Sequence, residues 1–561
     1  MMLMQWGQFI DHDLTEIHMI EKENDKCDRC EQYDTNSCFP IPIPDTDEFF
    51  NQPGAPRCFP FRRSKGERLD GHGPKEQANA LTSHLDASMV YGSDACTSER
   101  LRDPARRHLL RMSRSGGHVM LPLEQGTPGC RGQGGLCHQG GDVRVNEQPG
   151  LTSIHHAFLR HHNNLAARLL NLNPFWSEDR VFQETRRLIG AIVQHVTFSE
   201  FLPRVLGRKI MDEFELSIQE RGYFEKYDAS CSTGVFNEFS TAAFRFGHSM
   251  IQPEMVLMRE EEMMEAMSGS GNRHLRKTHL REHFNNPDFI RENPGVVEEL
   301  LRGLMTMPMG KVDTHFTSEI RNHLFEKKTR FSGLDLIALN IQRGRDHGIP
   351  GYNVYRRVCG LHPLESFNHI INDIPDDSLT RLRSVFSHPD DIDLFTGLMS
   401  EARLPGALVG PTLGCLLAVQ FSNFKKCDRF WYETSDSQIR FTPQQLEVIR
   451  GVTMSSLMCH GGHNMHLMPR YGFDLHDHTR NPLMECGKHP MNIIDLGPWE
   501  DRPRHFGAGF CPKEPASTSP CEACNCTEAG DVCGASCANL ITWFGARRVQ
   551  RDNMCACDIN F

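Results

Sequence analysis

The segment WGQFIDHDL near the start of the chain concentrates side chains that could transfer protons or bind cations. Gln8 and His12 are four residues apart and therefore share one helix face, while Asp11 and Asp13 flank the histidine on other faces. Taken alone, the segment favours a core helix with one hydrogen-bonded histidine and solvated acids. The functional alternative is a buried acid–base histidine whose acidic neighbours are held by ligands.

The segment LTSHLDAS carries Thr82, His84, Asp86 and Ser88 at every second position. Side-chain or carbonyl oxygens at this spacing can surround a hard cation, and calcium prefers oxygen ligands. One carboxylate is too few for a calcium site, so a second acid must come from elsewhere in the chain. The pattern also fits an ordinary Ser/Thr/Asp turn.

Three further segments combine arginine with other polar side chains. In AFRFGH, Arg245 and His248 are three residues apart, and His248 could bind iron or pack in a core. In DVRVNEQPG, Arg144 and Glu147 precede a predicted helix. The run ALNIQRGRDHG, residues 338–348, adds amide and arginine groups.

Helices must position these residues, because apolar side chains recur at intervals of three and four and clear alternating strands are rare. The pattern predicts helices over residues 1–18, 95–112, 150–172, 179–207, 209–220, 235–250, 294–307 and 443–459. We therefore expect a mainly α fold. No repeat of 20–50 residues is visible.

Composition excludes several classes of function. The 561 residues carry a formal charge of −11, which makes nucleic acid a poor partner, and no apolar run is long enough for a membrane span. The 21 cysteines, mostly scattered singly, indicate disulfides and hence a secreted, extracellular protein. The first residues do not resemble a signal peptide, because the apolar stretch runs into charged residues.

The composition changes near residue 509. Residues 509–561 hold eight cysteines and few core-forming side chains, so we expect a small Cys-rich module separate from residues 1–508. The spacing of Cys521, Cys524 and Cys526 raises zinc as an alternative, but cross-links are favoured because paired knuckles are lacking. Such a module could bind an extracellular matrix or cell-surface partner.

Taken together, WGQFIDHDL, LDASMVYGS, EQPGLTSIHH, FRFGHSMIQP, LNIQRGRDHGIPGYN and DRFWYE resemble the motifs of the animal haem peroxidases, in order over roughly residues 1–508. The resemblance implies the mainly α fold of that family, with the Cys-rich tail outside it. It also implies haem b and calcium as cofactors, and further residues ahead of Met1. The implied activity reduces hydrogen peroxide and oxidises halide, pseudohalide or phenolic, tyrosine-like donors through an oxidised haem.

The resemblance assigns roles on the two sides of the haem. His12 matches the acid–base histidine on the distal side, where peroxide binds, and Arg144 matches the distal arginine. Gln8 matches the glutamine beside the distal water and halide site. His248 matches the proximal iron ligand, and Asn340 matches the residue that receives a hydrogen bond from its other ring nitrogen.

Other matched residues would contact the haem edge. Asp11 and Glu147 match two carboxylates that such enzymes join to haem methyl groups as esters. Arg245 and Arg343 would lie near the propionates. Gln148 departs from the pattern, because a mammalian member of the family has a methionine there, bonded through sulfur to a haem vinyl group.

By the same resemblance, Asp13 supplies the second acid of a calcium site that also contains Thr82, His84, Asp86 and Ser88. His84 replaces a more usual apolar residue, but its expected ligand is the backbone carbonyl. The family pattern also pairs ten cysteines, leaving Cys96, Cys231 and Cys427 unassigned in the catalytic domain: Cys27–Cys38, Cys30–Cys58, Cys130–Cys137, Cys359–Cys415 and Cys459–Cys486.

Two other functions fit parts of the sequence. An extracellular matrix or adhesion protein could retain a peroxidase fold and bind partners through the tail, although the complete set of catalytic residues argues against inactivity. A fatty-acid oxygenase of the same superfamily would need a membrane-binding segment and a tyrosine radical site, and neither is evident in the sequence.

Overall fold

The computed structural model describes residues 1–20, 27, 29–67, 76–267, 275–369, 371–489, 491, 493–501, 550–551 and 554–555. The predicted Cys-rich module falls almost entirely outside the described residues, as do the zinc alternative and the fate of its cysteines. Its separation from residues 1–508 therefore stays a prediction.

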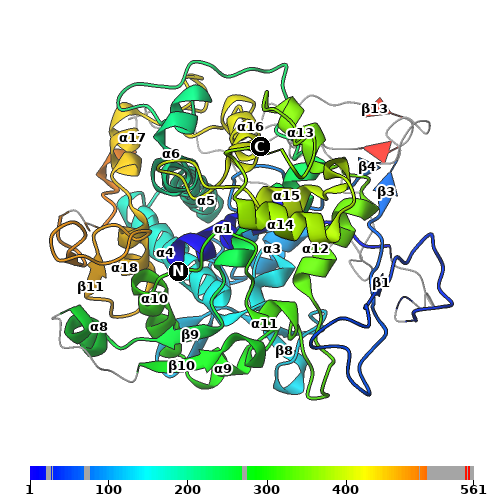
Figure 1. Cartoon of the computed structure of the whole chain (residues 1–561). Helices are drawn as coiled ribbons and strands as arrows, with labels where there is room; N and C mark the ends of the chain where they lie inside the picture. Colours follow the sequence, from blue (N-terminus) through cyan, green and yellow to red (C-terminus); the bar gives the residue numbers. More distant parts are fainter. Residues whose placement is uncertain are drawn as a thin grey trace.

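The described part is mainly helical, as predicted (Figure 1). The α-helices are α1 (Met2–Leu14), α2 (Ser88–Tyr91), α3 (Ala95–Leu101), α4 (Pro149–Leu172), α5 (Glu178–Val196), α6 (Leu202–Glu213), α7 (Asn237–Thr241), α8 (Glu260–Met267), α9 (Asp288–Glu292), α10 (Val296–Thr306), α11 (Ser318–Arg321), α12 (Leu336–Asp346), α13 (Tyr352–Val358), α14 (Asp376–Val385), α15 (Leu394–Met399), α16 (Pro411–Lys426), α17 (Pro443–Arg450) and α18 (Met454–Gly461). Short 3₁₀ and π segments connect several of them: η1 (Gln133–Gly135), η2 (Val143–Asn146), η3 (Thr197–Phe201), η4 (Ala243–Met250), η5 (Leu280–Glu282), η6 (Pro389–Asp391) and η7 (Gly497–Trp499).

Strands occur only as short antiparallel pairs among the described residues. The pairs are β1 (Ile41–Pro42) with β2 (Cys58–Phe59), β3 (Gly66–Glu67) with β4 (Glu76–Gln77), β5 (Ser113–Ser115) with β6 (His118–Met120), β7 (Leu123–Gln125) with β8 (Leu136–His138), β9 (Glu254–Leu257) with β10 (Arg276–His279), β11 (Leu467–Pro469) with β12 (Leu483–Glu485), and β13 (Gln550–Arg551) with β14 (Met554–Cys555). Each of these strands is only two to four residues long, so the core depends on helix packing.

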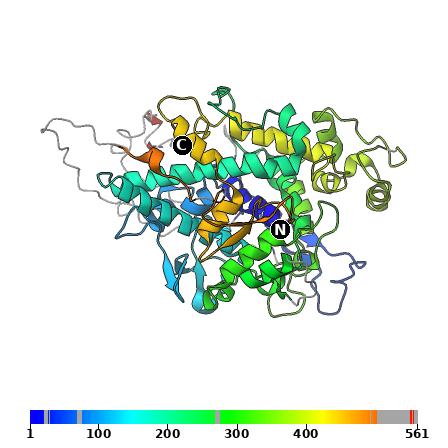
Figure 2. The same cartoon turned by 90° about the vertical axis from the view of Figure 1, so that its left-hand side faces the viewer.

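Helix α1 lies in the interior and is surrounded by other helices in both views (Figures 1 and 2). Trp6 and Phe9 are fully buried, and both rings pack against Phe158 of α4. The Trp6 indole donates a hydrogen bond to Thr197 Oγ1 at 3.2 Å, which ties α1 to the π segment η3. A helix embedded in this way holds its polar side chains in fixed positions.

Helix α4 begins where the sequence indicates. Gln148 is its N-cap, and the side-chain oxygen accepts a hydrogen bond from the N–H of Gly150 at 2.7 Å. Pro149 occupies the first turn, where its missing N–H costs nothing. The start of α4 therefore fixes the residues just before it, which include Arg144 and Glu147.

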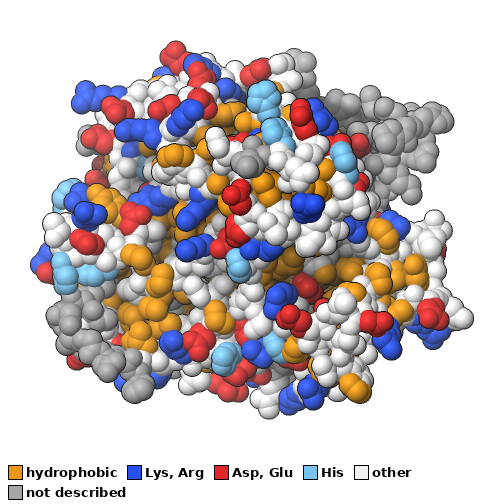
Figure 3. Space-filling model, viewed as in Figure 1, with side chains coloured by type: hydrophobic (Ala, Val, Ile, Leu, Met, Phe, Trp, Pro, Cys, Tyr) orange, Lys and Arg blue, Asp and Glu red, His pale blue; other side chains and the backbone are white. Residues whose placement is uncertain are grey.

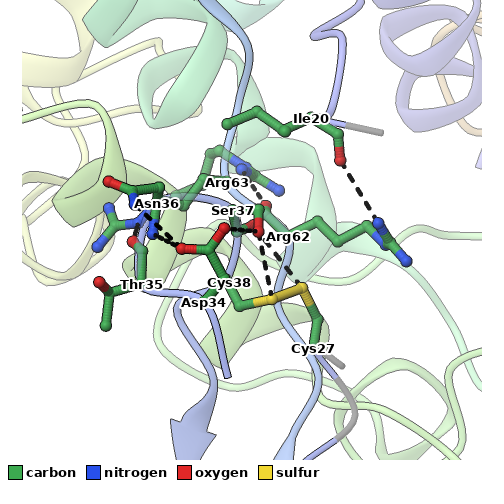
Figure 4. The surroundings of a disulfide bond; sticks show 10 residues. Ile20, Cys27, Asp34, Thr35, Asn36, Ser37, Cys38, Arg62 and Arg63 are labelled. Carbon is green, nitrogen blue, oxygen red and sulfur yellow. Dashed lines mark hydrogen bonds between the residues drawn. A yellow bond between two sulfur atoms is a disulfide. The ribbon is translucent and has the colours of Figure 1, made fainter. Parts of the chain in front are cut away.

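The five disulfides implied by the family pattern are present. Figure 4 shows the Cys27–Cys38 bridge beside Asp34, whose carboxylate accepts hydrogen bonds from Asn36 and Ser37. A sixth bridge joins Cys231 to Cys427, two of the cysteines that the sequence left unassigned. These residues are 196 positions apart, so only the fold could reveal the pair.

No helix among the described residues is long and apolar enough to cross a membrane. On the face drawn in Figure 3, lysine and arginine are interspersed with acidic side chains, and no continuous basic area covers it.

Candidate functional site

A cavity of about 560 Å³ brings together predicted site residues from distant parts of the sequence. Helix α1, the turn η2 and the segment η4 contribute to its walls. The predicted residues that line it are Gln8, Asp11, His12, Arg144, Glu147, Arg245, His248 and Arg343. Asn340 lies behind His248, so every residue predicted to be catalytic or to bind haem is found at this site.

His12 is 3% exposed and lies between two carboxylates. Its Nδ1 is 3.5 Å from Asp142 Oδ1, and its Nε2 is 3.7 Å from Glu147 Oε2. Burial lowers the pKa of His12 well below its usual value, and the nearby Arg144 guanidinium acts in the same direction. The imidazole is therefore neutral and able to accept a proton.

Arg144 is held by Asp142, a residue that the sequence analysis missed. Its Nη2 donates to Asp142 Oδ2 at 2.7 Å and its Nε donates to Oδ1 at 2.9 Å. The Nη1 atom lies 4.0 Å from Asp11 Oδ2, on the cavity side. The only sequence signal for this role is an aspartate two residues before the arginine in DVRVNEQPG.

Gln8 belongs to a cluster of three glutamine side chains beside Glu147. Its Nε2 donates to Glu147 Oε2 at 2.7 Å, and its Oε1 accepts hydrogen bonds from Gln5 and Gln148. Burial raises the pKa of Glu147 to about 7, despite the opposing charge of Arg144. Gln148 thus makes amide hydrogen bonds to both Gln5 and Gln8.

Asp11 lines the same cavity and keeps a raised pKa. Burial is the largest cause, and the Arg144 charge and a hydrogen bond from Thr15 oppose it. Thr15 Oγ1 donates to Asp11 Oδ1 at 2.9 Å. Both carboxyl groups predicted to form haem esters, Asp11 and Glu147, therefore border the cavity.

On the other side of the site, His248 contacts Asn340 of α12. Its Nδ1 is 2.8 Å from the Asn340 amide nitrogen, and the Asn340 oxygen accepts a hydrogen bond from Arg245 at 2.7 Å. The sequence predicts that Asn340 instead receives a hydrogen bond from the ring. That arrangement requires the amide to turn its oxygen towards Nδ1, because an imidazole that binds iron through Nε2 carries its proton on Nδ1.

The two arginines predicted near the propionates are both held by hydrogen bonds to other parts of the chain. Arg245 donates through Nε to the carbonyl of Ser240 and through Nη1 to Asn340. Arg343 donates through Nη1 to Ser64 and to the carbonyl of Arg62. Burial lowers the pKa of Arg343 to about 10, with Arg245 acting in the same direction. Both guanidinium groups border the cavity.

The predicted calcium residues also converge. Asp13 is fully buried and accepts hydrogen bonds from the backbone N–H groups of Ala87 and Ser88 and from the Ser88 hydroxyl. Burial raises its pKa strongly, and the neighbouring Asp86 carboxylate adds to that rise. Two neighbouring carboxylates, each raising the cost of charge on the other, are suited to bind a cation.

The other loop residues are hydrogen-bonded to one another. Thr82 Oγ1 donates to Asp86 at 3.1 Å, and the His84 ring lies 2.7 Å from the Thr82 carbonyl oxygen. The described residues contain no group of three or more His, Cys, Asp or Glu side chains arranged for a metal. A site here would therefore depend on hydroxyl and carbonyl oxygens in addition to two carboxylates.

The family model for animal haem peroxidase matches residues 1–473. Mouse peroxidasin homolog is 37% identical over 529 residues, covering 89% of this chain and 34% of the relative. Mouse eosinophil peroxidase is 37% identical over 481 residues, covering 82% of this chain and 64% of the relative. Pig thyroid peroxidase is 35% identical over 540 residues, covering 90% of this chain and 55% of the relative.

Solved structures show the same fold. Peroxidase A from Dictyostelium discoideum superposes with a TM-score of 0.65 at 29% identity, covering 83% of this chain and 85% of that chain. The rice fatty acid alpha-dioxygenase superposes with a TM-score of 0.61 at 19% identity, covering 82% of this chain and 73% of that chain. The latter likeness concerns the fold alone. This chain spans about a third of the length of the peroxidasin homologs.

Proposed function

Because the chain belongs to the animal haem peroxidase family, we propose that it is a secreted enzyme that binds haem b, reduces hydrogen peroxide and oxidises halide, pseudohalide or phenolic donors. One observation carries the proposal: His12 and Arg144 line the same cavity as His248. A base, a cationic group and a candidate iron ligand around one cavity are the parts that peroxide cleavage requires.

The residues present fit a haem. The cavity volume lies within the roughly 300–1,000 Å³ of small-molecule and cofactor sites. His248 Nδ1 is engaged by Asn340, which leaves Nε2 without a hydrogen-bond partner among the described residues. Burial lowers the pKa of His248 to about 3, with Arg245 acting in the same direction, so the ring is neutral and can donate an electron pair to iron.

The chain supplies proton transfer and charge stabilisation, while bound haem supplies the oxidising power. With haem bound, His12 would accept a proton from one oxygen of hydrogen peroxide and return it to the other oxygen, which leaves as water. The Arg144 guanidinium stabilises the negative charge that develops as the O–O bond breaks. Two electrons from donors, with two protons, complete the reduction to a second water.

Reconstitution with haem tests the proposal. The full chain should acquire a Soret band that changes on addition of peroxide, and it should oxidise iodide or a simple phenol with turnover. An adhesion protein that merely retains the fold would bind haem without peroxide-dependent turnover. Arg144→Ala is the matched control, because it should bind haem and lose most of that turnover.

Secretion and the partner of the tail extend the same proposal. Six disulfides among the described residues favour an oxidising compartment. We assign the Cys-rich residues 509–561 to binding an extracellular matrix or cell-surface partner. Deleting them should abolish such binding and leave peroxide turnover unchanged, and a loss of turnover on deletion would contradict this division of roles.

The range of donors should follow from Gln148. A methionine sulfur bonded to the haem withdraws electron density and raises its oxidising power, and an amide cannot form that bond. We expect no red-shifted Soret band of the sulfur-linked type, efficient oxidation of iodide, thiocyanate and phenols, and poor oxidation of chloride. Steady-state turnover near neutral pH measures this. Chloride oxidation as efficient as iodide oxidation would show that the missing sulfur link does not set the range.

Calcium is proposed as a structural cation at Asp13 and Asp86. Asp86→Ala should abolish stoichiometric calcium and lower the thermal unfolding midpoint, and it should also slow the peroxide reaction because Asp13 adjoins His12. Elemental analysis and thermal unfolding measure the first two effects. Asp94→Asn removes a carboxylate while keeping a side-chain cap on α3, because asparagine caps helices about as well as aspartate, and it serves as the control. Folded, active wild-type protein without calcium would contradict the site.

A further inference from the structure

We propose that Asp142 is a positioning residue that orients both His12 and Arg144, so that the two distal groups act as one unit. The inference rests on the proposed peroxidase function and adds a residue that the family resemblance did not supply. Its basis is that a single buried carboxylate lies within reach of both side chains.

The contacts with Arg144 fix the plane of the guanidinium. Asp142 accepts hydrogen bonds from Arg144 Nε at 2.9 Å and from Nη2 at 2.7 Å, and also from the Arg144 backbone N–H at 2.8 Å. This fork geometry allows little rotation of the guanidinium. It leaves Nη1 directed away from Asp142, towards Asp11 and the cavity, where it can meet developing negative charge.

The contact with His12 selects a ring tautomer. His12 Nδ1 is buried, has no hydrogen-bond partner among the described residues, and lies 3.5 Å from the Asp142 carboxylate oxygen that also receives Arg144 Nε. A carboxylate facing one ring nitrogen favours the proton on that nitrogen and leaves the other as the base. Nε2, near Glu147 at the cavity, is then the atom that accepts a proton.

The backbone around Asp142 is tightly constrained, so the carboxylate cannot easily move. The Asp142 side chain is fully buried, and its N–H donates to the Met89 carbonyl of α2 at 3.1 Å. A Cβ on the preceding Gly141 would lie 2.2 Å from the Ser88 carbonyl oxygen, which shows how closely the two segments approach. Burial alone would raise the pKa of Asp142, but the Arg144 charge, the neighbouring His12 and the hydrogen bonds from Arg144 together lower that pKa to about 2.

The experiment measures cyanide binding by the ferric, haem-loaded full chain, because hydrogen cyanide must give up its proton to a distal base as it binds. Stopped-flow Soret changes give the association rate without any turnover. Asp142→Asn should slow association by roughly 10–100-fold at unchanged haem content. Asp142→Glu, which keeps the charge, should recover part of the loss. The control Asp94→Asn alters another helix-capping aspartate and should have no effect.

A double-mutant comparison separates positioning from a general structural role. In a His12→Ala, Arg144→Ala background, Asp142→Asn should cause no further slowing, because the groups that it orients are gone. An equal loss in that background would overturn the proposal, as would an Asp142→Asn rate within threefold of wild type. If Asp142→Asn does not fold, an Asp142→Glu rate equal to wild type overturns it.

These outcomes are distinct from failure of the proposed function. If the wild-type chain binds haem but reacts with neither cyanide nor peroxide, the peroxidase proposal fails. If wild type reacts and His12→Ala is slow while Asp142→Asn is unaffected, the role of Asp142 alone fails.

Discussion

His12→Ala is expected to slow the reaction with hydrogen peroxide by ~10²–10⁴-fold while leaving the ferric haem bound. This loss is expected because His12 is a neutral, buried base that lines the cavity together with Arg144. Removing the imidazole removes the group that accepts and returns the peroxide proton. Haem attachment is unaffected because His12 is not the proposed iron ligand.

Stopped-flow absorbance after mixing with peroxide measures this step directly. Arg144→Ala should also slow it, through lost charge stabilisation, and should leave haem content near that of wild type. His315→Ala replaces a histidine whose side chain is 76% exposed and provides the control. An unchanged rate of the first oxidation step in His12→Ala would refute the assignment.

His248→Ala is expected to abolish stable histidine ligation of the iron. Among the predicted residues that line the cavity, the neutral imidazoles are His12 and His248, and His12 is assigned to the distal side. Ester bonds from Asp11 and Glu147 could still retain the porphyrin, so haem content alone does not decide the matter. The coordination state of the iron shows whether His248 is the ligand.

Absorbance and electron paramagnetic resonance spectra of reconstituted protein provide the measurement. His248→Gly should regain a histidine-like spectrum when imidazole is added, because the small ligand can occupy the space of the deleted ring. Asn340→Ala, which removes only the partner of Nδ1, is the control and should keep a histidine-ligated iron. A normal five-coordinate spectrum in His248→Ala would remove this residue from the role.

The sequence by itself determined the class of fold and most of the cavity. The local periodicity is sufficient to predict α1 and α4, because the apolar residues on the buried face of a helix recur at intervals of three and four. The family resemblance then predicted roles for His12, Arg144 and His248, and the structure places these three side chains around one cavity. Five of the six disulfides followed from the family pattern.

Only the tertiary structure showed which side chains from distant segments are in contact. Nothing local links Cys231 to Cys427, because their spacing reflects how distant segments fold together. Asp142 likewise carries only a weak signal, its position two residues before Arg144, since an aspartate before a helix is most simply a cap. Its contact with His12 crosses 130 positions of sequence and exists only because α1 is buried beside η2. Packing of distant segments brings the Asp142 carboxylate and the His12 imidazole together. The periodicity of apolar residues indicates which side chains are buried, but it does not indicate which side chains they contact.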